Sequence, residues 1–349
     1  MNATTVAVDL AKHRFELALA DEHWRILERR RLTRAAFGRF FANRPACHIV
    51  MEACGSSHHW ARTLSAQGHE VRLLPAQYVR AYVRRNKTDA ADAGALLEAA
   101  RSSEIRPVPV KSIEQQSIQQ LHRLRAQWMG TRTARINLLR GWLREFGLVI
   151  PTGAQRGIAA VRHALSASES SLPHALRALM FELLSEIAEL ERRVRDTERQ
   201  LRTLTREDPI VQLLLQIPGI GLLTATALRA AIVDIQRFPS GRHLASWLGL
   251  TAREYSSGER RRLGRISKRG DAYLRTLLIH GARAVLNASL AAARCGRALD
   301  HLRAWAIGIE SRCGYNKATV ALANKLARIV WASWKYERPF NGNWGRSSH

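Results

Sequence analysis

Short apolar runs alternate with amphipathic stretches along the first part of the chain. The apolar runs predict three strands close enough in sequence for an antiparallel meander, at residues 5–9, 15–20 and 24–32. Two further strands, at residues 48–52 and 70–74, alternate with helices at residues 34–43, 57–67 and from about Thr88. This order predicts a mixed sheet with helices on its faces, ending at Pro107-Val108-Pro109 because prolines do not fit a helix interior.

Two long helical patterns occupy the middle of the chain, separated by a Gly- and Ser-rich gap. Over residues 112–146, apolar residues recur at helical spacing with arginines between them. Over residues 176–204, they alternate steps of four and three, which predicts a heptad seam in which only Thr197 is polar. Such a helix must bury its stripe against residues 112–146 or against another copy of the chain, and periodicity leaves both partners open. The pattern therefore predicts a helical coiled-coil segment, with a homo-oligomer (dimer or tetramer) as a hypothesis.

The last third of the chain is helical again. Helices are predicted at residues 221–232, 243–248, 272–292 and 317–334, with an irregular, strongly basic loop between the second and the third. A length of 349 residues is enough for two to three domains that each bury a core. We predict three: an α/β domain over residues 1–108, a helical coiled-coil linker over 109–207, and a mostly α domain over 208–349.

The net charge points to a polyanionic partner. Lys and Arg number 55 against 29 Asp and Glu, a formal net charge of +26 on a chain that is 46% hydrophobic and therefore able to fold. Soluble surfaces usually mix the two signs and have a far smaller net charge. The excess argues against an ordinary metabolic enzyme or one with acidic substrates, and it favours nucleic acid as the partner.

Cysteine spacing and the first apolar stretch predict a cytoplasmic protein with reduced thiols. The first stretch already contains Asp9 and Lys12, which excludes a secretory signal there. Residues 210–228 are uncharged and nearly long enough to span a bilayer, but the breaker Pro218-Gly219 predicts a turn between two buried segments, so no membrane partner is expected. No Cys-x-x-Cys pair or finger spacing occurs among the four cysteines, Cys47, Cys54, Cys295 and Cys313.

Four carboxylates stand at positions that predict a common edge of the sheet. Asp9 and Glu52 each end an apolar strand, so neighbouring strands would set them side by side at the carboxyl edge. Asp89 and Asp92 follow Thr88, a good N-cap, and their spacing places both on one face of the first helical turn. At ~5 Å and an effective dielectric constant of about 20, repulsion costs about 3 kcal/mol per pair, so the cluster must protonate or hold a divalent cation. All-oxygen ligation suits Mg²⁺ or Mn²⁺, and a pair of such ions can hold both sides of a phosphodiester during displacement.

Simpler roles for the same acids are open. Asp89 and Asp92 favour a helix N-terminus, and Asp9 is also compatible with a strand end at a turn. A sugar-kinase or actin-like ATPase also ends its first strand in Asp, but that fold has glycine soon afterwards, and Asp9-Leu10-Ala11-Lys12 contains none. We therefore discount the ATPase.

Residues 253–269 form the densest basic segment, with seven Lys or Arg against two Glu. Guanidinium groups match phosphate oxygens, and interspersed glycines let the backbone come close. Ser257, followed by Gly258, is placed to attack a phosphodiester whose charge is already neutralised, although residue types alone favour a turn that only binds phosphate. The adjacent Ser256 is an alternative nucleophile that the residues alone do not separate from Ser257, and no histidine lies nearby to support Ser-His-Asp chemistry. The candidate nucleic-acid contacts are Lys12, Arg84, Arg85, Lys87, Arg253, Arg260, Arg261, Arg262, Arg265, Lys268 and Arg269.

A second DNA-contact candidate is the turn Pro218-Gly219-Ile220-Gly221. It is similar to the turn of a helix–hairpin–helix, which offers backbone amides to DNA phosphates. A plain turn between packed helices explains the same residues equally well.

Taken together, these motifs resemble the DEDD transposases of bacterial insertion sequences, insertion-sequence family 110, which include Piv-type DNA invertases. The resemblance covers nearly the whole chain, and one departure is Ala252, where the family commonly has proline. The amino-terminal motifs are Val8-Asp9-Leu10-Ala11-Lys12, Met51-Glu52-Ala53-Cys54-Gly55 and Lys87-Thr88-Asp89-Ala90-Ala91-Asp92-Ala93. The carboxyl-terminal motifs are Ile217-Pro218-Gly219-Ile220-Gly221, Trp247-Leu248-Gly249-Leu250, Tyr255-Ser256-Ser257-Gly258 and the run from Gly264 to Arg275.

The resemblance implies a RuvC-like (ribonuclease H) fold for the first domain, with Asp9, Glu52, Asp89 and Asp92 as metal-binding acids. It implies that Ser257 is the nucleophile of an RNA-guided serine recombinase, which forms a phosphoserine link to DNA and then rejoins the strands. The acids of one protomer and the serine of another would form the site, at the bacterial nucleoid, with Mg²⁺ or Mn²⁺ and an element-encoded guide RNA. The alternatives are a RuvC-like endonuclease or junction resolvase that uses activated water, and a DNA-binding regulator with inactive acids.

Overall fold

The computed structural model describes residues 4–82, 89–166 and 172–342. These residues belong to two compact units, Met1–Ser112 and Ile113–His349. The boundary between the units falls four residues after the predicted domain end at 108. The separation of residues 109–207 from 208–349 stays a prediction.

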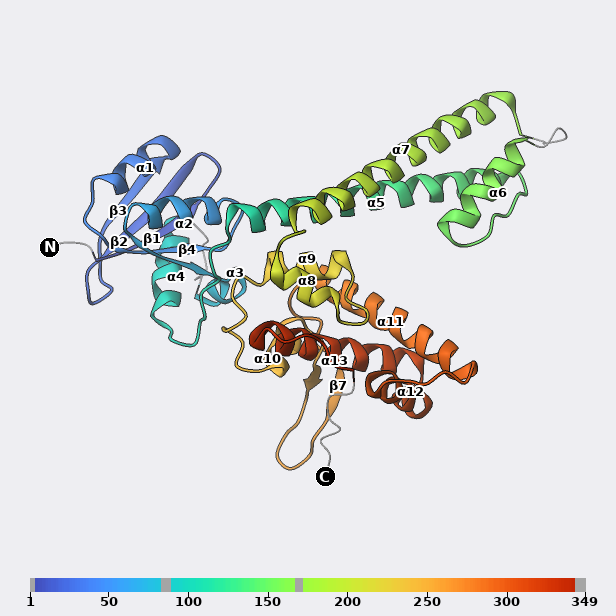
Figure 1. The fold of residues 1–349 in the computed structure, drawn as a ribbon. Helices are drawn as coiled ribbons and strands as arrows, with labels where there is room; N and C mark the ends of the chain where they lie inside the picture. The colour runs from blue at the N-terminus through green and yellow to red at the C-terminus, as the bar shows by residue number, and fades with distance from the viewer. Residues whose placement is uncertain (1–3, 83–88, 167–171, 343–349) are drawn as a thin grey trace. The chain divides into compact units, whose positions relative to one another are not determined.

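A five-stranded mixed sheet forms the centre of the amino-terminal unit (Figure 1). Its strand order is β3-β2-β1-β4-β5, in which the first three strands are antiparallel and β1, β4 and β5 are parallel. Short turns can join only antiparallel neighbours, whereas β4 and β5 are reached through helical crossovers. The predicted mixed sheet is confirmed. The strands are β1 (Thr5–Leu10), β2 (Arg14–Ala20), β3 (Ile26–Thr33), β4 (His48–Glu52) and β5 (Glu70–Leu74).

Helices cover both faces of this sheet. Val6 and Val8 of β1 point to a cluster that includes Phe37 and Trp60, whose rings lie edge to face at 4.8 Å. Ala7, between the two valines, points to the opposite face, where it packs against α4. Successive side chains therefore divide the strand between two cores. The helices are α1 (Arg34–Ala42), α2 (Ser57–Ala66), the short α3 (Ala76–Val79) and α4 (Asp89–Arg101), with a 3₁₀ turn at Arg80–Tyr82.

Two long antiparallel helices, α5 (Ile113–Glu145) and α7 (His174–Leu204), begin the second unit (Figure 1). Of the two partners that periodicity left open, the structure shows α5 of the same chain packed against the α7 seam. The coiled coil and a second copy of the chain stay predictions. Three ion pairs join the helices in antiparallel order, Arg125–Glu198 (2.7 Å), Arg132–Glu191 (2.5 Å) and Arg135–Glu186 (2.7 Å).

The predicted seam includes Leu176, Leu183 and Leu204, and at these three positions it differs from the buried stripe of α7. Leu184 is buried in place of Leu183, Leu176 at the start of the helix is half-buried, and Leu204 at its end is 59% exposed. The predicted gap between the long helices is also partly wrong, because α6 (Ala154–Ser166) forms there. Its buried Ile158 and Val161 pack with residues of α5 and α7 at the far end of the helix pair.

Six helices surround the apolar core of the carboxyl-terminal part. α13 lies at its centre, with Leu322, Leu326 and Val330 fully buried. The four predicted helices form as α9, α10, α11 and α13, while α8 and α12 were not predicted. Asp side chains cap α8, α11 and α12 by accepting backbone N–H bonds. The helices are α8 (Pro209–Leu215), α9 (Leu222–Ala231), α10 (Gly241–Trp247), α11 (Ala272–Arg294), α12 (His301–Cys313) and α13 (Tyr315–Tyr336).

Backbone packs directly on backbone where the α8–α9 turn meets α11. Gly219 has a φ of +82°, and a Cβ there would lie 2.8 Å from the carbonyl oxygen of Gly281. A Cβ on Gly281 would in turn lie 1.9 Å from the carbonyl oxygen of Gly219. This contact requires both glycines and explains the Pro-Gly-Ile-Gly turn as a packing feature, without a DNA ligand.

α11 is long and apolar enough to cross a membrane when judged by length and composition, alone among the described helices. Its buried residues Leu274, Leu278 and Leu286 belong to the core. The core helix of a folded domain passes the same test.

A buried histidine joins three helices of the second unit. Nδ1 of His122 on α5 lies 2.9 Å from the Tyr273 hydroxyl, and Nε2 lies 2.9 Å from the Thr226 hydroxyl. The Thr226 hydroxyl donates to the Leu222 carbonyl, so it accepts from Nε2–H and leaves Nδ1 to accept from Tyr273. Burial, reinforced by the charge of Arg125, lowers the pKa of His122 from 6.5 to about 4. The imidazole is therefore neutral at pH 7.

We expect acid to destabilise the second unit through His122. The folded-state pKa of about 4 lies below the unfolded value of 6.5, so the unfolded chain binds the proton more tightly. The free energy of unfolding therefore falls as the pH drops from about 6.5 to about 4, by about 3 kcal/mol for this group. Urea unfolding at pH 7 and pH 4 measures the drop, and His122→Gln, which does not titrate, should show a smaller one. An equal drop in both proteins would contradict the assignment.

Candidate functional site

Two of the predicted acids lie side by side at the carboxyl edge of the sheet. The parallel register of β1 and β4 pairs Val8 with Met51, so the next residues, Asp9 and Glu52, are neighbours. Both carboxylates also act on one thiol. Burial raises the pKa of Cys54, and the negative charges of Glu52 and Asp9 raise it further. A further negative charge beside these two carboxylates is unfavourable, so the thiol stays protonated.

α4 carries a third acid to the same face of the sheet. Ala7 and Val50 pack against α4, and Asp9 and Glu52 stand two residues further along the same strands. Because side chains alternate along a strand, the two carboxylates belong to the face that α4 covers. Asp92 lies in the first turn of that helix. Asp9 and Glu52 are therefore neighbours at the carboxyl edge, on the face that α4 covers, and Asp92 lies in the first turn of that helix.

One oxygen of the Asp92 carboxylate, Oδ1, is buried without a hydrogen-bond partner among the described residues. An unpaired buried carboxylate oxygen is unfavourable unless the group protonates or binds a cation. Asp89 is the first residue of α4, but its side chain lies outside the described part, as do Arg84, Arg85 and Lys87. Lys12 is exposed in the turn that follows β1.

A hard divalent cation fits this set of donors. Asp9, Glu52 and Asp92 offer only oxygen, the ligand that Mg²⁺ and Mn²⁺ prefer. Among the side chains that are described, no three of His, Cys, Asp or Glu form a group that encloses a metal ion. The three described acids therefore do not form a metal site by themselves.

The basic segment forms a β-hairpin rather than the irregular loop that was predicted. β6 (Ala252–Glu254) pairs with β7 (Leu263–Ile266) in antiparallel order. At the tip, Ser257 and Arg260 exchange backbone hydrogen bonds of 3.3 and 3.1 Å around a two-residue turn. Gly258 begins this turn with a φ of +54°, a conformation that favours glycine. The strands lack an apolar alternation, so the sequence pattern had no strand signal.

The two adjacent serines differ in their hydrogen bonds. The Ser256 hydroxyl donates to a Glu254 carboxylate oxygen at 2.7 Å and accepts from the Arg262 backbone N–H at 3.1 Å. Ser257 is exposed, and its hydroxyl forms no hydrogen bond with any residue of the described chain. The available hydroxyl at the hairpin tip is therefore that of Ser257.

Close backbone contacts fix the base of the hairpin. A Cβ on Gly249 would lie 2.0 Å from the Arg269 carbonyl oxygen, and one on Gly270 would lie 1.9 Å from the Trp247 carbonyl oxygen. The Lys268 N–H also donates to the Gly249 carbonyl at 3.1 Å. The loop before β6 and the loop after β7 thus meet in direct backbone contact, and the Arg275 guanidinium adds hydrogen bonds to the Leu248 and Arg269 carbonyls at 3.1 and 3.3 Å.

The cations of the hairpin stand in solvent. The Arg253 guanidinium donates to the Ser267 carbonyl at 3.1 and 3.3 Å and so helps to hold the two strands together. Arg261 lies 3.8 Å from the Glu254 carboxylate, a pair that solvent screens strongly. All seven predicted contacts on this segment are exposed, namely Arg253, Arg260, Arg261, Arg262, Arg265, Lys268 and Arg269.

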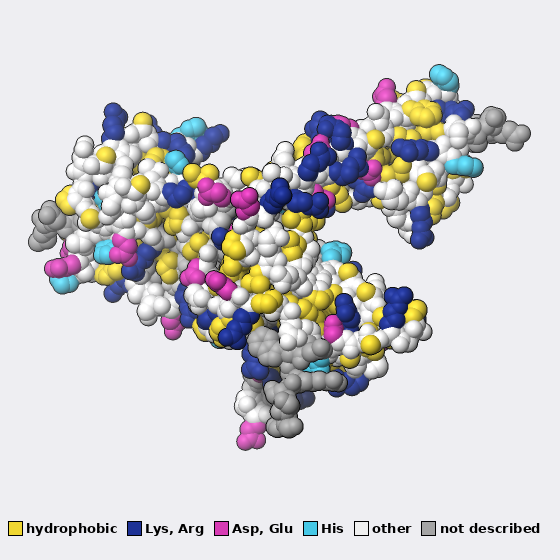
Figure 2. Space-filling model, in the orientation of Figure 1, with side chains coloured by type: hydrophobic (Ala, Val, Ile, Leu, Met, Phe, Trp, Pro, Cys, Tyr) yellow, Lys and Arg dark blue, Asp and Glu magenta, His cyan; other side chains and the backbone are white. Residues whose placement is uncertain are grey.

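Two cationic surfaces were missed in the sequence. Figure 2 shows Lys and Arg side chains gathered over the middle of α7, where Arg192, Arg193 and Arg199 form ion pairs with Glu189 and Asp196. A groove of about 1590 Å³ also opens beside β7, lined by cations of α10, α11 and α13. These groove residues come from separate segments, so no window of the sequence contains a signal for them.

The fold and the acidic edge define a class of protein. A five-stranded mixed sheet with carboxylates at its carboxyl edge fits a RuvC-like domain, found in enzymes that process nucleic acid. Residues 6–147 match a family model for DEDD transposases of the IS110 type, described as "Transposase". Residues 211–295 match a second, described as "Transposase IS116/IS110/IS902 family".

The chain belongs to the IS110 family of transposases. It is 44% identical to a "Probable family 20 transposase" of Pseudomonas aeruginosa, over 95% of this chain and 97% of the relative. It is 37% identical to the "Transposase for insertion sequence element IS1111A" of Coxiella burnetii, over 94% and 88%. It is 35% identical to the "Transposase for insertion sequence element IS1328" of Yersinia enterocolitica, over 95% and 96%. The protein is therefore a DNA recombinase of the transposase type, and its family implies a divalent metal.

Replacing Gly270 should displace the hairpin. Gly270→Ala adds a Cβ at a φ of +83° and against the Trp247 carbonyl, so we expect a loss of about 2 kcal/mol or more in the free energy of unfolding. Gly258→Ala is the control, because a Cβ there meets open space and only the φ of +54° is unfavourable. Urea unfolding of both variants, with limited proteolysis of the hairpin, measures the difference. A larger loss for Gly258→Ala would show that the base of the hairpin is not fixed in this way.

Proposed function

We propose that this transposase cuts and rejoins the strands of its own insertion element through a covalent link to Ser257. The observation that carries the proposal is the exposed, unbonded Ser257 hydroxyl at the tip of a basic hairpin, beside a Ser256 hydroxyl that is already engaged. Membership of the family supports the same role for Ser257, because the motif Tyr255-Ser256-Ser257-Gly258 lies within the part of the chain that matches the family model.

The proposed step is a displacement at phosphorus. A bond forms from Ser257 Oγ to phosphorus while the bond from phosphorus to one bridging oxygen breaks. The Oγ proton passes to water, and the released bridging oxygen takes up a proton. The exposed arginines of the hairpin neutralise the phosphate oxygens as the hydroxyl approaches. Because the phosphoserine link keeps the bond energy, attack by a DNA hydroxyl restores the strand and the serine.

Asp9, Glu52, Asp89 and Asp92 would hold the divalent ion, Mg²⁺ or Mn²⁺. When bound, the ion supplies Lewis-acid stabilisation of negative charge on phosphate oxygens. The buried Asp92 Oδ1 without a partner supports this assignment. The four carboxylates orient the ion, and their own repulsion is relieved by it.

We also propose the partners and the setting. A structured RNA encoded by the element would guide the protein to donor and target DNA, and a homodimer or tetramer would bring acids and serine from different protomers to one phosphate. Both proposals derive from the family resemblance, and the net charge of +26 suits them. Such a protein would work in the bacterial cytoplasm, at the nucleoid.

One observation favours a second candidate, a RuvC-like endonuclease or junction resolvase. Asp9 and Glu52 are neighbours at the carboxyl edge of the sheet, and carboxylates that hold a metal ion can activate water for attack without a serine. Ser257 would then contact phosphate only, and no covalent intermediate would form.

Trapping of a covalent adduct separates the two candidates. Suicide DNA substrates with the matching RNA should give a denaturant-stable protein–DNA adduct with the wild type and none with Ser257→Ala. Ser256→Ala is the matched control and should keep the adduct, with a reduction of less than about tenfold because it loses only a positioning hydrogen bond. Asp9→Ala should abolish cleavage under either candidate. DNA cleavage by Ser257→Ala without an adduct would establish the endonuclease instead.

Metal binding should depend on Asp92. Saturating Mg²⁺ or Mn²⁺, at about 100 times Kd, should stabilise the wild type by about 2.7 kcal/mol. Asp92→Asn should lose most of this effect and, without metal, should unfold at an equal or higher temperature because it removes an unpaired buried charge. Glu98→Gln on the same helix, where Glu98 pairs with Arg101 in solvent, is the control. Calorimetric melting with and without metal measures both effects, and an equal metal response in Asp92→Asn and Glu98→Gln would refute the site.

A further inference from the structure

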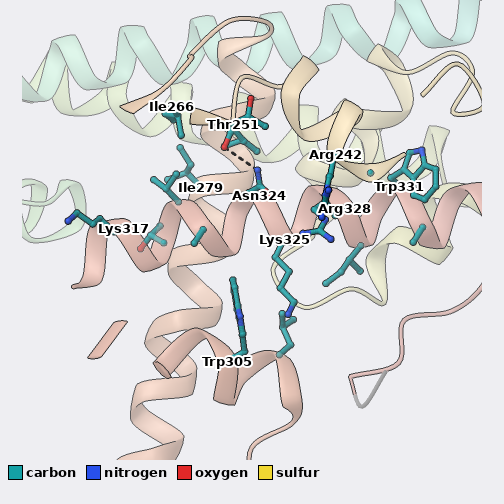
Figure 3. Close-up of a pocket in the computed structure, with 18 of the residues that line it drawn as sticks. Arg242, Thr251, Ile266, Ile279, Trp305, Lys317, Asn324, Lys325, Arg328 and Trp331 are labelled. Carbon is teal, nitrogen blue, oxygen red and sulfur yellow. Dashed lines mark hydrogen bonds between the residues drawn. The ribbon is translucent and has the colours of Figure 1, made fainter. Parts of the chain in front are cut away.

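The groove beside β7 is too large for a small-molecule site. Its volume of about 1590 Å³ exceeds the roughly 300–1,000 Å³ of ordinary ligand pockets. α13 runs along its length, and β7, α10, α11 and α12 complete the walls (Figure 3). Ile266 and Ile279 line one end, while Trp305 and Trp331 lie further along α12 and α13. The shape is that of an extended channel with an apolar floor.

The charges of this groove have one sign. Among the described residues that line it, seven are Lys or Arg and none is Asp or Glu. Lys317, Lys325 and Arg328 follow one another along α13, over about 16 Å at the rise of an α-helix (Figure 3). Burial and the neighbouring Arg328 charge lower the pKa of Lys325, which reflects the crowding of cations. The seven cations are Arg242, Arg265, Lys268, Arg283, Lys317, Lys325 and Arg328.

A concave surface of one sign, without acids to neutralise it, concentrates a polyanion. The cations of α13 therefore extend far enough to meet several successive phosphates of one strand. The arginines over α7 differ in this respect, because Glu189 and Asp196 pair with them.

Aromatic rings among these cations distinguish an unpaired strand from a duplex. The Lys325 ammonium lies 4.2 Å from the centre of the Trp305 ring, and Trp305 and Trp331 are only half-buried. Unpaired bases stack on such rings, whereas a duplex keeps its bases inside and presents its phosphates. Cations alone would suit either form, but the rings at the groove wall suit only exposed bases.

We propose that this groove binds an unpaired stretch of nucleic acid, with phosphates along the cations of α13 and β7 and at least one base against Trp305. The inference deepens the proposed function, on which it rests for the nature of the ligand. Arg265 and Lys268 belong both to the groove and to the serine hairpin. A strand held in the groove therefore continues onto the hairpin, and strand exchange requires such an unpaired strand.

Binding of the full-length protein to labelled oligonucleotides tests the proposal. The probes are single-stranded DNA, single-stranded RNA and duplex DNA of one arbitrary sequence, each about twelve nucleotides long. Trp305→Ala should weaken single-strand binding about tenfold and Trp305→Phe less than about threefold, with duplex binding changed less than about twofold. Lys325→Ala should lower the slope of log K against log salt for single strands by about 0.7. Fluorescence anisotropy across a salt series gives all of these values.

Matched controls exist on α5 and α7. Trp128 is also half-buried with a cation over its ring, since Arg193 lies 5.1 Å from the ring centre, but neither residue lines the groove. Trp128→Ala and Arg193→Ala should leave single-strand affinity within about twofold. Thermal melting of each variant identifies any that fails to fold. If Trp305→Ala unfolds, the single-strand affinities of Trp305→Phe and the salt dependence of Lys325→Ala still decide the test.

Each outcome supports or overturns the proposal. A loss confined to single-stranded DNA identifies the element's own strand as the ligand, a loss confined to RNA identifies a guide, and a loss of both identifies a groove indifferent to the sugar. If the groove variants lose equal affinity for duplex and single strands, or lose affinity for neither, the proposal is overturned. A protein segment found as the occupant of the groove would also overturn it. The probes contain no cleavable site, so failure of the serine adduct leaves this result intact, and failure here leaves the adduct result intact.

Discussion

The parallel pairing of β1 with β4 is the constraint on which the acidic site depends. The register of this pairing makes Asp9 and Glu52 neighbours at the edge where both strands end. The negative charges of both carboxylates raise the pKa of the Cys54 thiol, which burial also raises. α4 closes that face and adds Asp92, whose buried oxygen has no partner among the described residues. Like charges at one edge of a sheet repel one another, and the proposed divalent ion would relieve that repulsion. The strand order is thus what makes the proposed metal site possible.

Close backbone contacts position the hairpin that presents the proposed nucleophile, Ser257. Gly249 and Gly270 admit carbonyl oxygens where any Cβ would collide, and this close approach anchors a hairpin whose own strands are exposed and rich in arginine. The hairpin needs no apolar face, so its surface is free to contact phosphate. Ser256 is used within the hairpin and Ser257 is left available. The two adjacent serines thus differ in their hydrogen bonds, and the proposed nucleophile is the one whose hydroxyl is not engaged within the hairpin.

α13 links the core to the proposed strand-binding groove. One side of the helix buries Leu322, Leu326 and Val330, and the other presents Lys317, Lys325 and Arg328. Asn324 between them donates to the Leu250 carbonyl at 3.1 Å, which ties the helix to the loop before β6. The proposed nucleic-acid surface therefore stands on the same rigid element that stabilises the core, as a positioned binding surface requires.

Local pattern was sufficient for the strands of the sheet, the two long helices and four carboxyl-terminal helices, because alternation and helical spacing act over neighbouring residues. It also placed Asp9 and Glu52 at strand ends. It missed α6, α8 and α12, whose short apolar stripes are completed by distant neighbours, and the hairpin, whose pairing depends on Gly249 and Gly270. The partner of the α7 seam, the free hydroxyl of Ser257 and the groove of α13 arise from segments far apart in the chain. Contacts of that kind exist only once the chain has folded, so tertiary structure alone decided them.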